Sequence, residues 1–448
     1  MNISTIRKTI GVILCIEAAF MLPPFALAVA DGSEAAMRGF ASGIAAVLLV
    51  GLPCGIIRSK DRPLGARDGF VTVALAWIII SLFGAVPFYA SGVIPSISGA
   101  VFETVSGFTT TGATIIDDVE AAPRAILLWR SITNWIGGMG VLVFLLAIAP
   151  VAREGGSMFL LRAEFPGPMA AKLVPRMQKS AKLLYEIYIV MTLAQIILLL
   201  LGGIPLFDCV NISLSTVSTG GFCVRNDSMA SYGAYAQNVT LVFMTLCSIS
   251  FSLFYCAVAR EFLRIRRSRE LRTFIIVVLG VALLMGLDTA SKIESLGQGV
   301  HHTLFQVVSI ISTTCYVSVD ASFWSPFVWS MLTVLMITGP MSGSTGGGMK
   351  LSRVMILCKS TYRAIARTVA VVMTGVVLSL DGLTIGDGML AGISSLSNVG
   401  YGIDSNTFTM GVSRLSIPSK AVLCFDMFLG RLEIFPMLIL FAPDTWKK

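Results

Sequence analysis

Four short segments decide how this chain folds: Thr110-Thr111-Gly112-Ala113, Thr219-Gly220-Gly221-Phe222, Thr314-Cys315-Tyr316-Val317 and Asn398-Val399-Gly400-Tyr401. Each lies between two hydrophobic stretches and follows an apolar segment too short to cross a bilayer; these segments are 94–106, 205–218, 302–312 and 386–397. A dehydrated monovalent cation is coordinated by rings of backbone carbonyl oxygens, which four small-residue loops meeting on one axis can supply. We therefore predict that the four segments are quarters of one ion filter.

The composition predicts a membrane protein. The chain has 448 residues, of which 55% are hydrophobic and 13% charged, and its mean hydropathy is +0.83. In soluble domains roughly a quarter of residues are charged. The nine cysteines are scattered and lack CxxC spacing, so they indicate neither a disulfide framework nor a zinc site.

Ten apolar stretches approach the roughly 20 residues that a membrane-spanning helix needs. They are 10–30, 37–57, 70–90, 125–149, 183–201, 239–258, 273–287, 326–338, 365–380 and 421–441. Most of the 33 Lys and Arg residues fall on one side of these spans, and the positive-inside rule identifies that side as cytoplasmic. This distribution also explains the net charge of +8 without a nucleic-acid partner. We therefore expect both termini in the cytoplasm and all four filter segments on the external side.

The resulting unit is helix, re-entrant half-helix, filter segment, helix. Half-helices that end at the filter direct their partly negative C-terminal ends toward a cation. Irregular backbone at this depth is tolerated only where it is buried in protein or lines a wet pore. A lone Thr-Thr-Gly is usually a turn, but four matching segments in a fourfold hydropathy repeat argue for a shared function.

A glycine-rich run from Gly343 to Gly348 interrupts the apolar segment that follows the third filter. Four glycines within six residues favour a break, because each costs a helix interior about 1 kcal/mol. The alternative is a phosphate-binding loop, but the G-x-x-x-x-G-K-[ST] spacing fails, since Met349 precedes Lys350 and Leu351 follows it.

An enzyme is the weakest hypothesis. The only histidines, His301 and His302, are adjacent, and no G-x-S-x-G or H-E-x-x-H motif accompanies them. We favour a hydrated loop for this pair over metal ligation, because no carboxylate or cysteine cluster completes a coordination sphere. Glu103 and Arg130 are expected to be structural charges at the external mouth.

Taken together, these motifs resemble the pore-forming subunits of the Trk/Ktr/HKT superfamily of potassium transporters, most closely the TrkH type. The resemblance rests on Ser106-Gly107-Phe108-Thr109-Thr110-Thr111-Gly112-Ala113-Thr114, Trp135-Ile136-Gly137-Gly138-Met139-Gly140, Ser215-Thr216-Val217-Ser218-Thr219-Gly220-Gly221-Phe222, Gly343-Ser344-Thr345-Gly346-Gly347-Gly348-Met349-Lys350, Ser397-Asn398-Val399-Gly400 and Gly430-Arg431-Leu432-Glu433. It implies an all-α membrane protein with four membrane–pore-loop–membrane repeats around a pseudo-fourfold pore, preceded by two N-terminal transmembrane helices. The expected divisions are a two-helix domain at 1–66 and repeats at 67–152, 153–268, 269–360 and 361–448.

The resemblance also implies roles for individual residues. Potassium would bind at filter carbonyls of Thr110, Thr111, Gly112, Thr219, Gly220, Gly221, Thr314, Cys315, Asn398, Val399 and Gly400. An intramembrane gate in the third repeat would comprise Gly343, Ser344, Thr345, Gly346, Gly347, Gly348 and Lys350, held by Arg431. From the residues alone, Arg431 has an alternative as a local partner of Glu433 or Asp426, or as a snorkelling side chain.

The function implied is potassium uptake across the bacterial inner membrane through a gated, channel-like pore, with no enzymatic activity and no bound cofactor. The implied partners are membrane lipid, a second copy of the chain and a cytosolic TrkA-type nucleotide-binding regulatory subunit. The alternatives are a sodium-permeable or weakly selective cation channel or symporter of the same fold, and a secondary transporter with a midplane substrate site, which inverted repeats would favour.

Two features depart from the family pattern. Cys315 stands where the family has glycine, and cysteine resists positive φ more than glycine does, so we expect weaker potassium selectivity. The second departure is length, because the chain from Lys350 to Asn398 is shorter than is usual in the family. Within this segment the stretch 365–380, with Arg367 near its start, is marginal for a full crossing, and we expect a short or tilted span there.

Overall fold

The computed structural model describes residues 3–56, 66–140, 177–290, 296–357, 364–400, 412 and 415–432. Within these ranges the chain is helical, with loops between the helices. The predicted boundaries at 152/153 and 360/361 involve residues outside the described ranges, as do Tyr401 and the end of the last predicted span.

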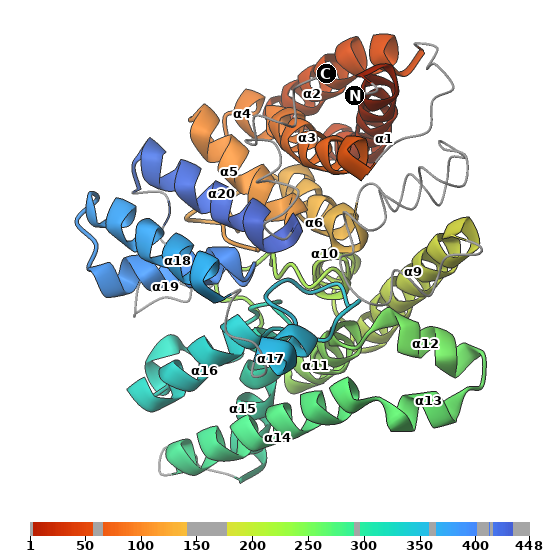
Figure 1. Cartoon of the computed structure of the whole chain (residues 1–448). Coiled ribbons are helices and arrows are strands. Elements are labelled where there is room, and N and C mark those ends of the chain that lie inside the picture. The colour runs from red at the N-terminus through yellow and green to blue at the C-terminus, as the bar shows by residue number, and fades with distance from the viewer. Residues whose placement is uncertain are drawn as a thin grey trace.

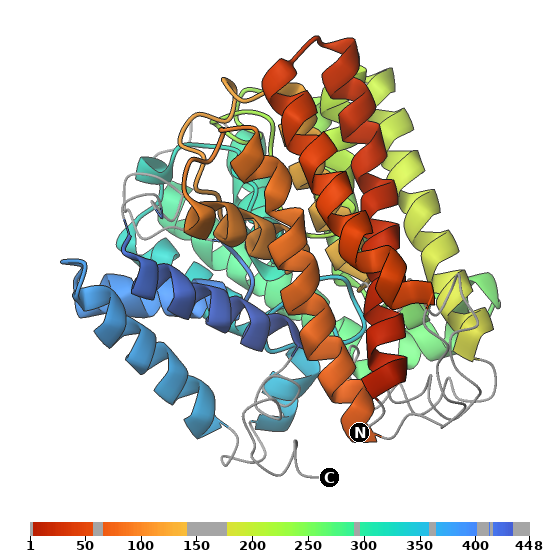
Figure 2. The same ribbon diagram turned by 90° about the horizontal axis from the view of Figure 1, so that it is seen from above.

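Two long helices begin the chain: α1 (Ile3–Ala30) and α2 (Glu34–Ile56). They pack side by side, and small residues permit the close approach: a Cβ added to Gly51 would lie 3.0 Å from Leu14 Cβ. Figure 2 shows them as a long antiparallel pair on one side of the molecule. This matches the predicted two-helix N-terminal region.

Four units follow, each containing a short helix that leads into one of the four segments quoted at the start of the sequence analysis. These short helices are α5 (Ile97–Phe108), α10 (Leu206–Val217), α15 (Leu296–Ile311) and α19 (Ile385–Leu396). The flanking helices are α3 (Ala66–Gly84), α4 (Val86–Ala90), α6 (Arg124–Met139), α9 (Met177–Leu201), α11 (Ala234–Ser248), α12 (Phe251–Val258), α13 (Phe262–Arg267), α14 (Arg269–Thr289), α16 (Pro326–Thr338), α17 (Leu351–Leu357), α18 (Ala364–Ser379) and α20 (Ile417–Leu432), with the short 3₁₀ helix η3 (Ala321–Phe323) before α16. In Figure 1 the units succeed one another around loops at the centre, and α20 of the last unit packs on α5 of the first.

The part of the chain that the structure describes lacks long portions of two of the ten predicted spans, because 141–149 and 433–441 lie outside it. Five helices of the described chain are long and apolar enough to span a bilayer, or six if the bent pair α11 and α12 counts as one span. Helix α16 has 13 residues, about 20 Å of helix, because Gly339 adopts φ 66° directly after it. Helix α18 has 16 residues, in keeping with the short or tilted span expected there.

The predicted span 239–258 is not one continuous helix. Helices α11 and α12 meet at a bend of 92°. At the bend, Ser248 O accepts from Met341 N (3.1 Å) and Phe251 N donates to Gly343 O (2.8 Å). Backbone of the glycine-rich segment thus takes up polar groups that a continuous helix would satisfy internally.

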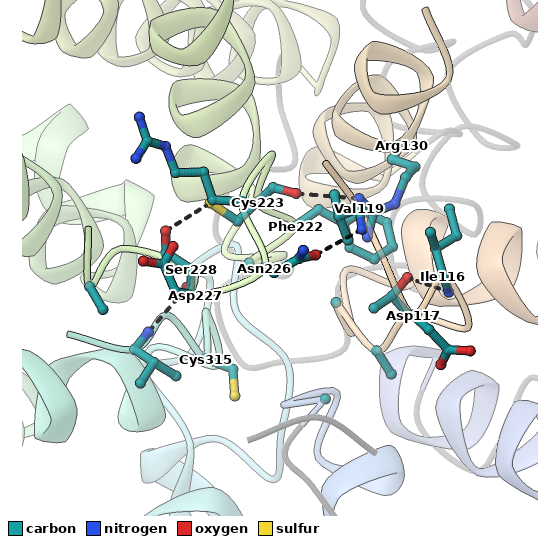
Figure 3. Close-up of a pocket in the computed structure, with 18 of the residues that line it drawn as sticks. Ile116, Asp117, Val119, Arg130, Phe222, Cys223, Asn226, Asp227, Ser228 and Cys315 are labelled. Carbon is teal, nitrogen blue, oxygen red and sulfur yellow. Dashed lines mark hydrogen bonds between the residues drawn. The ribbon is translucent and has the colours of Figure 1, made fainter. Parts of the chain in front are cut away.

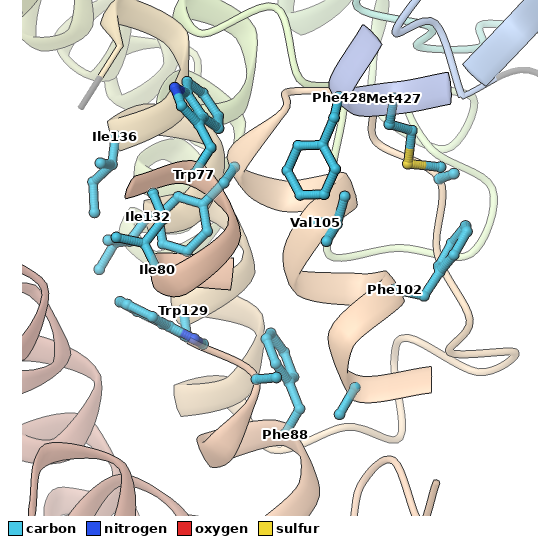
Figure 4. Close-up of a cluster of buried hydrophobic side chains, with 14 of the residues drawn as sticks. Trp77, Ile80, Phe88, Phe102, Val105, Trp129, Ile132, Ile136, Met427 and Phe428 are labelled. Carbon is cyan, nitrogen blue, oxygen red and sulfur yellow. The ribbon is translucent and has the colours of Figure 1, made fainter. Parts of the chain in front are cut away.

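A large apolar core joins the first unit to the last helix. Figure 4 shows Trp77 and Phe88 packed with side chains of α5 and α6, and Phe428 of α20 beside Val105. The indole of Trp129 donates to Gly84 O at 3.0 Å, which satisfies its buried polar atom. This core fixes the first filter segment relative to α20, which carries Arg431.

Candidate ion-conducting site

The four short helices end in equivalent turns. In each, a backbone N–H donates over 2.8–3.0 Å to the carbonyl of a serine five residues earlier. The serines are Ser106, Ser215, Ser309 and Ser394, and the donors are Thr111, Gly220, Thr314 and Val399. The N–H of the preceding residue bonds to the residue three before it in all four turns. Four sequences with little identity thus adopt one backbone path.

Each turn contains two left-handed residues separated by one residue. The first are Thr110 (φ 56°), Thr219 (57°), Thr313 (65°) and Asn398 (54°); the second are Gly112 (76°), Gly221 (74°), Cys315 (62°) and Gly400 (72°). Non-glycine residues rarely occupy this region. The repeated departure indicates a conformation that the surrounding structure imposes.

The backbone angles correct our alignment of the third segment. We aligned Thr314 with Thr110, but Thr313 occupies that position, so our set of filter residues omitted Thr313. The serine five residues before each backbone donor provided a signal: all four segments fit Ser-x-x-[Ser/Thr]-[Thr/Asn]-x-[Gly/Cys]. The alignment of Cys315 with the three glycines agrees with our prediction. Cys315 adopts φ 62°, so it occupies the left-handed region although its Cβ makes that region less favourable than it is for glycine.

Neighbouring turns touch in cyclic order. A Cβ added to Gly112 would collide with the carbonyl of Gly220, and one added to Gly221 would collide with that of Thr314. A Cβ on Gly400 would collide with Thr111 O. These glycines therefore allow backbone to pack against backbone at the first–second, second–third and fourth–first contacts.

One cavity of about 430 Å³ opens on the four turns together. Its lining includes the second left-handed residue of every turn, namely Gly112, Gly221, Cys315 and Gly400. Figure 3 shows Cys315, Phe222 and Cys223 beside this cavity, with Arg130 on the α6 side. Residues from the four units thus meet at one cavity.

Charges at this mouth have both signs. Asp117, Asp227 and Asp320 line the cavity together with Arg130 and Arg225. Hydrogen bonds from the side chain and the backbone N–H of Ser322 lower the pKa of Asp320. Outside the cavity lining, the Asn226 side chain lowers the pKa of Asp118 in the same way. Asp320 and Asp118 are therefore ionised at neutral pH, where they attract cations.

The glycine-rich segment forms a non-helical loop, as predicted, between α16 and α17. Gly343 (φ 76°), Gly348 (72°) and Lys350 (68°) are left-handed. The Lys350 ammonium donates to Gly346 O. Ser342 N donates to Glu270 Oε1 at 2.6 Å, and Leu351 N to Pro340 O at 2.9 Å. The loop is therefore ordered by its own contacts and by α14.

This loop packs on the third and fourth turns, at the end opposite the cavity. Gly347 N donates to Thr313 Oγ1 at 2.9 Å. A Cβ on Gly346 would lie 2.7 Å from Ser312 O, and one on Gly347 2.6 Å from Asn398 Cβ. The loop contacts residues that precede Cys315 and Gly400, whereas Cys315 and Gly400 themselves line the cavity.

Arg431 connects this loop to the first unit. Its guanidinium donates to Thr345 O (2.8 Å), Thr110 Oγ1 (3.1 Å) and Gly138 O (2.9 Å), and also to Gly137 O. The carboxylate of Asp426, one of the partners considered above for Arg431, accepts from Thr374 Oγ1 at 2.6 Å. Glu433 lies outside the described residues. Sequence reasoning missed Gly137 and Gly138 as partners, although the quoted Gly137-Gly138 motif contains them.

The expectation of a hydrated loop for the histidines is wrong. His301 and His302 lie within α15 and are half-buried. His301 Nε2 lies 2.7 Å from Gln237 Oε1, and His302 Nδ1 lies 3.1 Å from Ser318 Oγ. They connect the start of the third short helix to α11 and to the loop that follows the third turn.

Comparison with known proteins places the chain in a family. The family model TrkH, described as "Cation transport protein", matches residues 35–368. The chain is 33% identical to "Trk system potassium uptake protein TrkH" of Halomonas elongata and 30% identical to "Trk system potassium uptake protein TrkG" of Escherichia coli, in each case over 100% of both chains. It superimposes on the crystal structure of the potassium transporter TrkH from Vibrio parahaemolyticus with a TM-score of 0.87 and 28% identity, covering 100% of both chains. The chain is therefore a multi-pass membrane protein of the TrkH cation transport family, a family of transporters and not of enzymes.

Proposed function

We propose that this protein takes up potassium across the bacterial inner membrane through a gated, channel-like pore. The observation that carries the proposal is the convergence of four equivalent left-handed turns on one cavity. Such turns present closely spaced carbonyl groups, which replace the hydration shell of a monovalent cation. The relatives named as potassium uptake proteins support potassium as the ion.

The glycine-rich loop is the proposed gate. Its contacts with Ser312, Thr313 and Asn398 lie on the side of the turns away from the external cavity. An ion leaving the filter inward would meet this loop. The bond from Arg431 to Thr345 O supports a closed position by tying the loop to α20.

The partners proposed with this function are lipid, a second copy of the chain and a cytosolic nucleotide-binding regulatory subunit of TrkA type, with both termini cytoplasmic. They follow from the family resemblance. The basic residues of 260–272 offer a surface for an acidic partner or anionic lipid headgroups.

A second candidate is a sodium-permeable or weakly selective pore of the same fold. Cys315 favours it, because its side chain occupies a position that is glycine in the other three turns. Paired uptake of ⁸⁶Rb⁺ and ²²Na⁺ into liposomes containing the purified chain, without nucleotide, tests both. Rb⁺ uptake at least tenfold above Na⁺ uptake supports potassium selectivity, and equal uptake supports the second candidate. An absence of both fluxes, also after addition of the regulatory subunit and ATP, refutes the pore.

A further inference from the structure

A buried ion pair lies beside the first and second turns. Glu103 of α5 and Arg130 of α6 pair through Oε1 and Nε at 2.7 Å, and their side chains are 0% and 2% exposed. Burying two charges costs solvation that their attraction often does not recover. Stability alone is therefore a weak reason for such a pair at this place.

Glu103 holds the segment that leaves the first turn. Its Oε1 accepts from Thr114 Oγ1 at 2.9 Å, and its Oε2 accepts from Ile115 N at 2.8 Å. Thr114 and Ile115 follow Gly112 by two and three residues. Hydrogen bonds to a charged acceptor are the stronger ones, so the carboxylate fixes this segment to its own short helix.

Arg130 extends the same contact to the second turn. Its Nη1 donates to Cys223 O at 3.3 Å, and its guanidinium carbon lies 4.2 Å from the centre of the Phe222 ring. Figure 3 shows Arg130 beside Phe222 at the cavity. Phe222 and Cys223 directly follow Gly221. The pair thus joins the outer ends of two adjacent turns.

The other units lack this charge. Counting back from the serine of each turn, the positions equivalent to Glu103 hold Ile212, Gln306 and Ala391. The buried pair therefore acts at one of the four contacts between turns, the one at which Gly112 packs against Gly220.

The pair also sets the charge that an arriving cation meets. Arg130 lines the cavity, and Glu103 is the ion-pair partner that the described structure gives it. Without the carboxylate, a guanidinium in a poorly solvated site would face the ion path, where charge interactions are weakly screened.

We propose that Glu103 and Arg130 are positioning residues of the ion path: they fix the spacing of the first and second turns and keep their mouth free of an unpaired positive charge. This rests on the proposed function of the chain as a cation pore. The ligand concerned is the transported monovalent cation.

The experiment separates charge from position by measuring KM and maximal rate for ⁸⁶Rb⁺ uptake, and the Rb⁺/Na⁺ ratio, in liposomes. Glu103→Gln leaves Arg130 unpaired, and we expect KM to rise at least tenfold. The double variant Glu103→Gln/Arg130→Gln removes both charges, so its KM should return to within threefold of the parent value. Its Rb⁺/Na⁺ ratio should remain below that of the parent, because the two turns are no longer joined. Glu103→Asp keeps the charge on a shorter side chain and should change the ratio more than KM.

The matched control is Asp31→Asn. It removes an exposed pair, since Arg124 and Asp31 are 54% and 26% exposed at 3.1 Å, and it should leave KM and ratio unchanged. If Glu103→Gln does not fold, Thr114→Val removes one partner of the carboxylate without changing charge and should lower the ratio at constant KM.

If every folded variant has the KM and the Rb⁺/Na⁺ ratio of the wild-type protein, the inference is overturned and the pair serves packing only. Absence of flux in the wild-type protein, with the regulatory subunit and ATP present, instead contradicts the pore itself.

Discussion

The substitution Cys315→Gly tests how much of the filter geometry depends on side chains. Cys315 has φ 62° where the three equivalent glycines have 72–76°. The backbone is thus already in the region that glycine adopts. We therefore expect the carbonyl groups of the third turn to keep their positions in the variant.

The expected energies are small. A left-handed conformation costs an L-residue about 1–2 kcal/mol, and glycine loses about 0.5–1 kcal/mol of additional chain entropy on folding. The variant should therefore gain about 0.5–1 kcal/mol of stability, or at most about 2–4 °C in melting temperature. The K⁺/Na⁺ permeability ratio should change by less than about twofold, roughly 0.4 kcal/mol of differential binding.

Bi-ionic potential measurements on the purified protein give the ratio, and thermal unfolding in detergent gives the stability. Gly221→Cys is the matched control, because its Cβ would collide with Thr314 O, and it should abolish flux. In a Cys223→Ser background, small methanethiosulfonates should block the protein with Cys315 and leave the glycine variant unaffected. A tenfold change in the ratio, about 1.4 kcal/mol, would refute this reasoning and show that the Cys315 side chain governs selectivity.

Three further predictions concern the gate and the histidines. Arg431→Ala removes the 2.8 Å hydrogen bond to Thr345 O, which is worth about 1.5–3 kcal/mol for a charged donor, so basal Rb⁺ flux should rise about tenfold or more. The control Arg124→Ala should have the flux of the parent protein. Unchanged flux in a folded Arg431→Ala protein contradicts the role of Arg431 in holding the loop. Deletion of residues 346–348 should raise leak, because it removes the backbone that packs on Ser312 O and Asn398, and normal basal flux at normal folded yield counts against a gate. Burial lowers the pKa of His301 and of His302 below their ordinary values, so the unfolded chain binds more protons: stability should be complete above about pH 6.5 and fall as the pH drops through the folded pKa values. His301→Gln/His302→Gln should flatten this acid limb of the unfolding profile, and an unchanged limb assigns it to the carboxylates.

Hydrophobicity and local residue type were sufficient for much of the architecture. The two N-terminal helices, the four short helices and the glycine-rich break lie close to where the sequence placed them, because each depends on a local property: a run of apolar residues, a length too short to cross, or several glycines together. Distant contacts explain the errors. Helix α11 stops at Ser248 because backbone of residues 341–343 bonds there, and hydropathy carries no sign of this. The histidines pack in α15 because Gln237 and Ser318 meet them from other parts of the chain.

The alignment error at the third turn has a different cause. Cys315 removed the glycine that marks the other three turns, and alignment on Thr-x-Gly alone could not choose between Thr313 and Thr314. The serine five residues before each donor is the safer marker, since the hydrogen bond to its carbonyl closes the turn whatever side chains follow. The pair of Glu103 and Arg130 was visible as two charges, but their 27-residue separation concealed that they meet.

The four turns share one backbone conformation, but different structures pack against them on opposite sides of the ring. At three contacts between turns a glycine packs against backbone of the next turn and no Cβ fits. Cys315 carries a Cβ at the corresponding position of the third turn. Gly346 and Gly347 of the proposed gate pack between Ser312 of the third turn and Asn398 of the fourth. The ion pair instead joins the first and second turns, on the other side of the ring. If the loop is the gate that we propose, this arrangement would let it move while the first and second turns, held by the ion pair and by the core around Trp77 and Trp129, keep their geometry.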